Sequence, residues 1–91
     1  MAAFLVAYDL RRPGCQYDDF LARLEDFQST CHGLDAGCFV ATDGTADEVR
    51  NALTPHLHPG DGLIVTAITP DDASWTGLQP EVRRWIHTHL S

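Results

Sequence analysis

Three short segments of this 91-residue sequence are apolar at consecutive positions, not only at alternate ones. They are the ranges 2–10, 37–43 and 63–69, and the last is rich in β-branched residues, which favour strands. Because side chains alternate between the two faces of a strand, each segment predicts a strand that is apolar on both faces. We therefore expect a sheet that needs a covering layer on each side.

Between these segments the apolar spacing changes to that of a helix. Over residues 17–28 apolar side chains recur at steps of three and four. A second helix is predicted to begin at Thr45, because Thr45 and Glu48 fit the capping box in which each side chain bonds to the other residue's backbone amide. Its apolar stripe runs through Ala46, Val49, Leu53 and Leu57. Residues 29–34 read either as a short strand or as a loop.

The predicted order is β-α-β-β-α-β, which is typical of the ferredoxin-like α+β arrangement. In that arrangement two helices cover one face of a four-stranded antiparallel sheet. We expect a single domain over residues 1–91, with a core at about 2–69 and a C-terminal segment at 70–91, where Pro80 suits the first turn of a last helix. The second face then needs its own cover. Trp75 and Trp85 are expected to pack there, and a second copy in a twofold homodimer is expected to cover the rest.

The net charge of the chain limits the classes of molecule that it is expected to bind. The chain has 13 acidic residues and six basic ones, all arginine, for a formal net charge of −7. An acidic surface repels nucleic-acid backbones, so broad DNA binding is disfavoured, although the arginine pairs at 11–12 and 83–84 leave room for a local RNA or DNA contact. Three cysteines without a CxxC motif, and the lack of a signal peptide or long apolar stretch, predict a cytoplasmic protein with no membrane span.

Asp9 is the main candidate site residue. It ends the first apolar segment, shares a strand face with Leu5 and Ala7, and is followed by Arg11 and Arg12. That face is the one assigned to the second copy, so a twofold axis would bring two Asp9 carboxylates together. Such a pair needs a proton, water or a cation, and Mg²⁺ or Mn²⁺ would be suitable, with Arg11 and Arg12 binding phosphate. Alternatively, Asp9 accepts hydrogen bonds from the turn at 11–14 and only shapes it.

The sequence resembles the bacterial SinR-like proteins, relatives of CRISPR-associated protein 2, in the stretches AFLVAYDLRRPGCQYDDF, CFVATDGTADEVRNAL, GDGLIVTAIT and SWTGL. The resemblance covers Ala3 to about Gly77 and implies a ferredoxin-like homodimer. In some relatives the strand-one aspartate, here Asp9, is assigned to metal-dependent cleavage of RNA or DNA. Other relatives are structural dimers that bridge partner proteins and bind duplex DNA without nuclease activity.

Two functions therefore remain open. One is a divalent-metal-dependent endonuclease in which Asp9 is the metal ligand and catalytic residue. The other is a non-catalytic dimeric scaffold that recognises a protein partner, which the acidic charge favours. DNA-bridging relatives have basic surfaces, and this lysine-free chain departs from them.

Other polar patterns predict no separate site. The two His-x-His pairs, at 56–58 and 87–89, lack nearby cysteines, and residues two apart on a helix do not face each other, so zinc is disfavoured. Cys31 and His32 are sequence neighbours with no visible oxyanion-hole element, so they are not expected to form a nucleophile pair. Asp61, in PGDGL, is interpreted as a turn residue.

Overall fold

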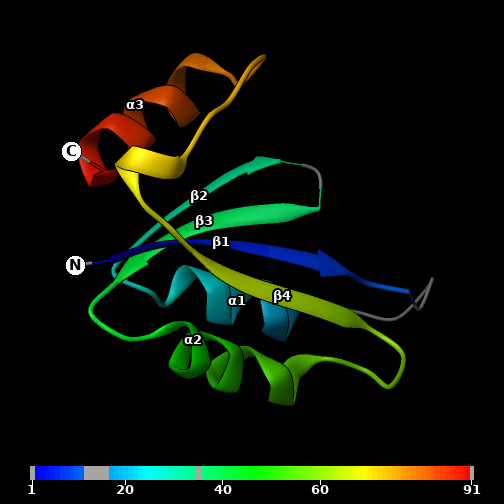
Figure 1. The fold of residues 1–91 in the computed structure, drawn as a ribbon. Helices are drawn as coiled ribbons and strands as arrows, with labels where there is room; N and C mark the ends of the chain where they lie inside the picture. The colour runs from blue at the N-terminus through cyan, green and yellow to red at the C-terminus, as the bar shows by residue number, and fades with distance from the viewer. Residues whose placement is uncertain (1, 12–16, 35, 91) are drawn as a thin grey trace.

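The computed structural model describes residues 2–11, 17–34 and 36–90. Its elements, in chain order, are β1 (Ala2–Asp9), α1 (Asp18–Glu25), β2 (Ser29–Leu34), β3 (Gly37–Thr42), α2 (Ala46–Leu53), η1 (Thr54–His56), β4 (Gly62–Ile68), η2 (Pro70–Asp72) and α3 (Pro80–Leu90) (Figure 1). The four strands form one antiparallel sheet in the order β2-β3-β1-β4. This confirms the predicted ferredoxin-like α+β arrangement with a C-terminal extension.

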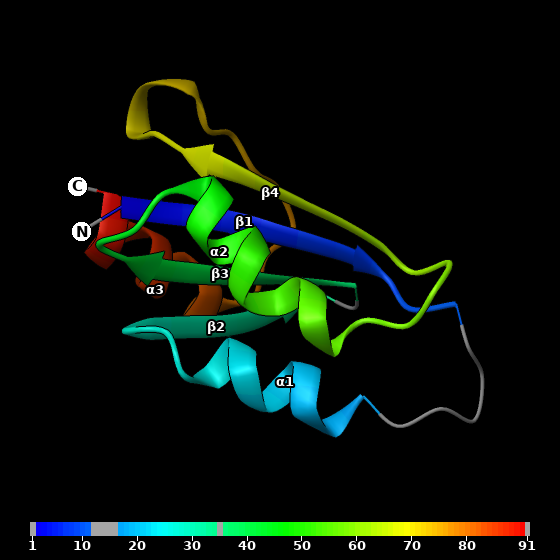
Figure 2. The same cartoon turned by 90° about the horizontal axis from the view of Figure 1, so that it is seen from below.

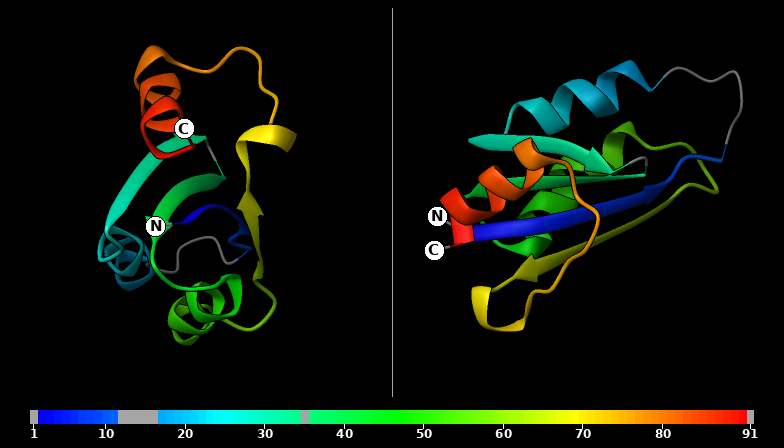
Figure 3. Two further views of the ribbon diagram at one scale, coloured as in Figure 1. Left: turned by 60° about the vertical axis from the view of Figure 1, so that its left-hand side comes forward. Right: turned by 90° about the horizontal axis from the view of Figure 1, so that it is seen from above.

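The first layer is formed by α1 and α2, which lie together on one face of the sheet (Figures 2 and 3). Alternate residues of the two central strands point into it, as the strand pattern predicts. The buried core of this layer consists of Phe4, Val6, Phe20, Leu24, Cys38, Val40, Val49 and Leu53. Each helix contributes two of these side chains, so burial of one apolar stripe holds each helix on the sheet.

The second layer is formed by α3, on the opposite face (Figure 3). Its stripe of Val82, Ile86 and Leu90 is buried against Ala3 and Phe39 of the central strands. Trp85 extends this layer, because its ring packs on Phe39 with 5.9 Å between centroids and its Nε1–H donates to Ser29 Oγ at 2.9 Å. The prediction that the C-terminal segment covers part of this face is therefore confirmed.

The boundaries of several predicted elements shift. Residues 29–34 form a strand, which settles the alternative between strand and loop. The first helix ends at Glu25, three residues earlier than predicted. The second has the predicted capping box at Thr45, but it ends at Leu53 because Pro55 cannot donate the helical hydrogen bond and the chain tightens into η1. No helix within the described ranges is both long enough and apolar enough to span a bilayer.

Candidate functional site

Asp9 lies at the end of β1, on the face opposite α1 and α2. Its register partner is Gly62, the first residue of β4, and a Cβ placed on Gly62 would lie 3.6 Å from Asp9 Cβ. The helix-facing residues Phe4 and Val6 are fully buried, whereas Asp9 is exposed. Tyr8 packs on Phe20 of α1, so Asp9, the next residue along the strand, points to the opposite face, as predicted. Two shallow hollows of about 440 and 320 Å³ flank its side chain.

The carboxylate of Asp9 is paired with Arg11. Arg11 Nε donates to Asp9 Oδ2 at 2.6 Å, and the two side chains are 63% and 61% exposed. Exposed ion pairs are screened by water and contribute about 0–1 kcal/mol, so this pair orients the guanidinium more than it stabilises the fold. Arg12, the second predicted phosphate ligand, lies outside the described residues.

Asp61 has the turn-shaping role that the sequence suggested for Asp9. Its Oδ1 accepts the backbone N–H of Arg11 at 2.9 Å, and its Oδ2 accepts that of His58 at 2.9 Å. The hydroxyl of Tyr17 lies 2.9 and 3.0 Å from the two oxygens. Asp61 therefore ties the end of β1, the start of α1 and the loop before β4 together. Gly60, with φ of 93°, gives this loop the left-handed turn that places Asp61.

The surroundings of Asp61 change its protonation. Desolvation alone would raise the pKa of this carboxyl. The backbone amides of Arg11 and His58, the Tyr17 hydroxyl and the nearby His58 ring outweigh that effect, so the pKa of Asp61 is lowered below its usual range. The sequence predicts only a local turn role for Asp61. No sequence pattern links it to Arg11 or Tyr17, because those contacts depend on the pairing of β4 with β1.

The described residues of one chain do not by themselves fit a divalent metal ion. Among the described residues, no three His, Cys, Asp or Glu side chains are grouped so that they could hold one. Mg²⁺ takes one or two carboxylates together with waters or substrate phosphates. Asp9 offers one carboxylate, already bonded to Arg11, and both oxygens of Asp61 accept hydrogen bonds. The predicted Mg²⁺ or Mn²⁺ site therefore depends on a second Asp9 from another copy.

Two of the histidines and one of the cysteines in the described residues take structural positions. His89 Nε2 lies 3.1 Å from Ser29 Oγ, and its ring lies against Trp85 with 4.4 Å between centroids. His32 pairs with Glu25 across the α1–β2 connection. Cys38 is fully buried, and burial raises the pKa of its thiol to about 11, so it is a core residue and not a nucleophile.

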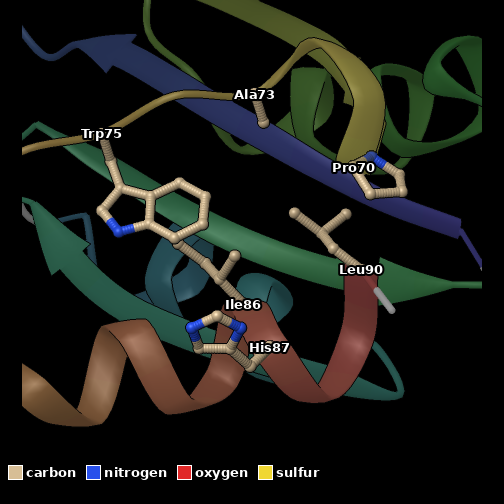
Figure 4. A pocket seen from close by; sticks show the side chains of 6 residues that line it. All are labelled: Pro70, Ala73, Trp75, Ile86, His87 and Leu90. Carbon is tan, nitrogen blue, oxygen red and sulfur yellow. The ribbon is translucent and has the colours of Figure 1, made fainter.

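A separate pocket of about 260 Å³ lies between η2 and α3, on the second face of the sheet (Figure 4). It is lined by Pro70, Ala73, Trp75, Ile86, His87 and Leu90. Trp75 is 40% exposed and meets the His87 ring edge-on, with 5.9 Å between centroids. The lining is largely apolar, and His87 is its one side chain capable of acid–base chemistry. The pocket therefore does not resemble a catalytic site.

The half of the second face around β4 has little cover. In the strand register, Ala7 of β1 lies between Gly37 of β3 and Ile64 of β4. Two of these three positions therefore have only a methyl side chain or no side chain. Ile64 is 63% exposed, the most exposed of the large apolar side chains in the described part of the chain. This bare area adjoins Asp9 at the end of the same strand pair.

A scan against protein-family models finds no match for this chain, and searches of curated proteins and of solved structures find none either.

Proposed function

We propose that this chain acts as a homodimeric, non-catalytic protein-interaction scaffold. The observation that carries the proposal is the bare β4 side of the sheet, where Ile64, the third of the seven residues of β4, is 63% exposed. Burying an exposed Ile side chain contributes roughly 1.5–3 kcal/mol, so a second copy placed here gains stability from each chain. The resemblance to relatives of CRISPR-associated protein 2 supports the same assembly.

The charge of the chain favours a protein partner over a nucleic acid. A net charge of −7 without lysine gives a dimer a charge of −14, twice that of one chain. Such a surface repels phosphates and suits a partner with a basic surface. The carboxylate of Asp9 is paired with Arg11 and both oxygens of Asp61 accept hydrogen bonds, which supports a role without metal chemistry in each chain.

A second function, metal-dependent cleavage of RNA or DNA, is favoured by one observation. Asp9 is exposed at the strand end, lies beside the Arg11 guanidinium, and is flanked by two hollows. In a face-to-face dimer, two Asp9 side chains would supply the carboxylates that a divalent ion requires, and Arg11 would hold a phosphate.

One assay separates the two functions. Wild type, Asp9→Asn and Glu25→Gln, an exposed acid on the far side of the sheet as control, are incubated with single- and double-stranded RNA and DNA, with Mg²⁺, Mn²⁺ or chelator. The scaffold proposal predicts the same background cleavage for all three proteins. Cleavage that requires metal, persists in Glu25→Gln and is lost in Asp9→Asn would overturn it and establish the nuclease.

A further inference from the structure

A hollow on the second face of the sheet lies beside the segment that joins η2 to α3. This segment, residues 73–79, forms no helix or strand, and we call it the strap. Figures 1 and 3 show it running from the β4 side of the sheet to the start of α3. Ala73 and Leu78 pack against the buried cluster that α3 forms with the sheet. The hollow between the strap, α3 and the strands, which we call the strap hollow, has a volume of about 510 Å³.

The strap hollow has an apolar floor and adjoins the 260 Å³ pocket of Figure 4. The two cavities share four lining residues: Ala73, Trp75, Ile86 and Leu90. The strands add Leu5, Phe39 and Ile68 to the lining of the larger one. Pockets that hold small organic molecules commonly have volumes of about 300–1,000 Å³ and mostly apolar walls. The strap hollow is therefore large enough and apolar enough for the body of a small molecule.

The polar side chains that line the strap hollow favour a cation. They are Thr66, Asp72 and Ser74, and Asp72 is the only charged one. Asp71 precedes it in η2, and the whole chain has a net charge of −7. None of the described arginines lines either cavity, and Arg83 and Arg84 are exposed on α3. A bound anion would therefore meet a carboxylate and no arginine, whereas a cation would be attracted.

Two aromatic rings in the lining favour the same class of ligand. Phe39 lies in the floor, where it is 7% exposed, and Trp75 is 40% exposed on the strap. Figure 4 shows the Trp75 indole reaching from the strap toward Ile86 and His87 of α3. The faces of aromatic rings attract organic ammonium groups, and tryptophan does so most strongly. Aromatic rings and one carboxylate thus line the same hollow.

We propose that the strap hollow binds a small organic amine. The apolar body of the amine lies on the floor between Phe39 and Ile86, and its ammonium group lies beside the Asp72 carboxylate. The Thr66 and Ser74 hydroxyls are acceptors for the remaining N–H groups. A fatty acid of the same length lacks a cationic partner in this lining, and an alcohol of that length makes no use of the charge of Asp72.

This site is separate from the surface proposed for the second copy. The dimer proposal depends on the bare area around Ile64, and Ile64 does not line the strap hollow. Amine binding is therefore expected in the single-chain form as well as in the dimer. A chain that never dimerises would overturn the scaffold proposal and leave the amine site standing.

Three ligands that share one alkyl chain test the charge preference. Octylamine, octanoate and octanol are titrated into the wild-type protein at pH 8, where an alkylamine is protonated as a lysine side chain is. NMR shifts of the backbone amides report the affinity and the place of binding. Octylamine is expected to bind most tightly and octanoate most weakly, with shifts in residues 73–79 and α3. Equal affinities for the three ligands, shifts elsewhere in the chain, or no octylamine binding at millimolar concentration would overturn the proposal.

Variants of the two neighbouring acids of η2 separate a local contact from the general field of an acidic chain. Asp72→Asn is expected to weaken octylamine binding by about threefold to fivefold, since exposed ion pairs are screened by water, and to leave octanol binding unchanged. Asp71→Asn removes the same charge from a residue that does not line the hollow, and its affinity is expected to stay within twofold of wild type. Asp72→Lys is expected to make octanoate the tighter ligand. Equal losses in Asp72→Asn and Asp71→Asn would contradict the contact with Asp72.

A substitution that fills the hollow tests the place of the alkyl chain. Ala73 lines both cavities, so Ala73→Leu is expected to abolish binding of octylamine and octanol alike. Circular dichroism establishes that this variant is folded, and the Asp72 and Asp71 variants change only exposed side chains. Wild-type octylamine affinity in folded Ala73→Leu would show that the amine binds outside the strap hollow.

Discussion

Asp61 accepts the backbone amide hydrogen of Arg11 at 2.9 Å, although fifty positions separate the two residues. This bond joins the loop before β4 to the chain leaving β1. Two carboxylates in this region therefore have different roles. Asp61 holds the backbone in place, whereas the neighbouring Asp9 forms an exposed side-chain ion pair with Arg11.

Asp61→Asn is expected to destabilise the protein at neutral pH and to have little effect in acid. The folded-state pKa of Asp61 lies below its unfolded value of about 3.9, so its stabilising contribution is fully present above that value and is lost as the pH falls through the folded-state pKa. Urea unfolding at a series of pH values from 7 downward, at one protein concentration, measures the pH at which the difference between the two proteins disappears.

Asp9→Asn is the matched control for that experiment, because Asp9 is an exposed carboxylate in the same region. Its loss is expected to change the free energy of unfolding by less than about 1 kcal/mol at pH 7. If Asp9→Asn destabilises the protein more than Asp61→Asn does, the division of roles between the two carboxylates is wrong.

The fold was more predictable from the sequence than the site. A strand that is apolar on both faces and a capping box such as Thr45–Glu48 can be recognised from residues close together in the sequence. Both features were predicted, and both are confirmed. The Asp61 contacts were not predictable, because Arg11 and Tyr17 reach Asp61 only after β4 has paired with β1. The roles of Asp9 and Arg11 toward metal and phosphate stay predictions, because both depend on a second chain or a ligand.

Thr45→Ala is expected to cost about 1 kcal/mol of unfolding free energy. The Thr45 hydroxyl accepts from the Glu48 amide and the Glu48 carboxylate accepts from the Thr45 amide, both at 3.2 Å, so the substitution removes one of the two reciprocal bonds. Thermal unfolding of Thr45→Ala and Thr45→Ser is informative, since serine retains the hydroxyl. A loss of the same size in both variants would show that the cap hydrogen bond is not its cause.

Ile86→Ala is expected to destabilise the protein by roughly 2–5 kcal/mol, because Ile86 is 4% exposed at the centre of the α3 contact with the sheet. Trp85 is its neighbour on α3, so its fluorescence reports detachment of the helix. Thr88→Ala, on the exposed side of α3, is the control and is expected to cost less than about 1 kcal/mol. Equal stability of Ile86→Ala and wild type would contradict the covering role of α3.

Cys38 is expected to resist thiol reagents in the folded protein. With a pKa of about 11, only about one thiol in a thousand is ionised at pH 8, and the side chain is fully buried. Mass spectrometry after brief exposure to a maleimide, with and without urea, measures the modification at each cysteine. Rapid modification of Cys38 without urea would show that the layer formed by α1 and α2 opens easily.

The central claim is that two copies join through the bare β4 side of the sheet. Sedimentation equilibrium of wild type and Ile64→Lys at micromolar concentration tests it most directly. The expected result is a wild-type species of twice the 10.0 kDa mass of one chain, with Ile64→Lys shifted toward a single chain. A wild-type protein that sediments as a single chain, or an Ile64→Lys variant that dimerises as tightly as wild type, would contradict the claim.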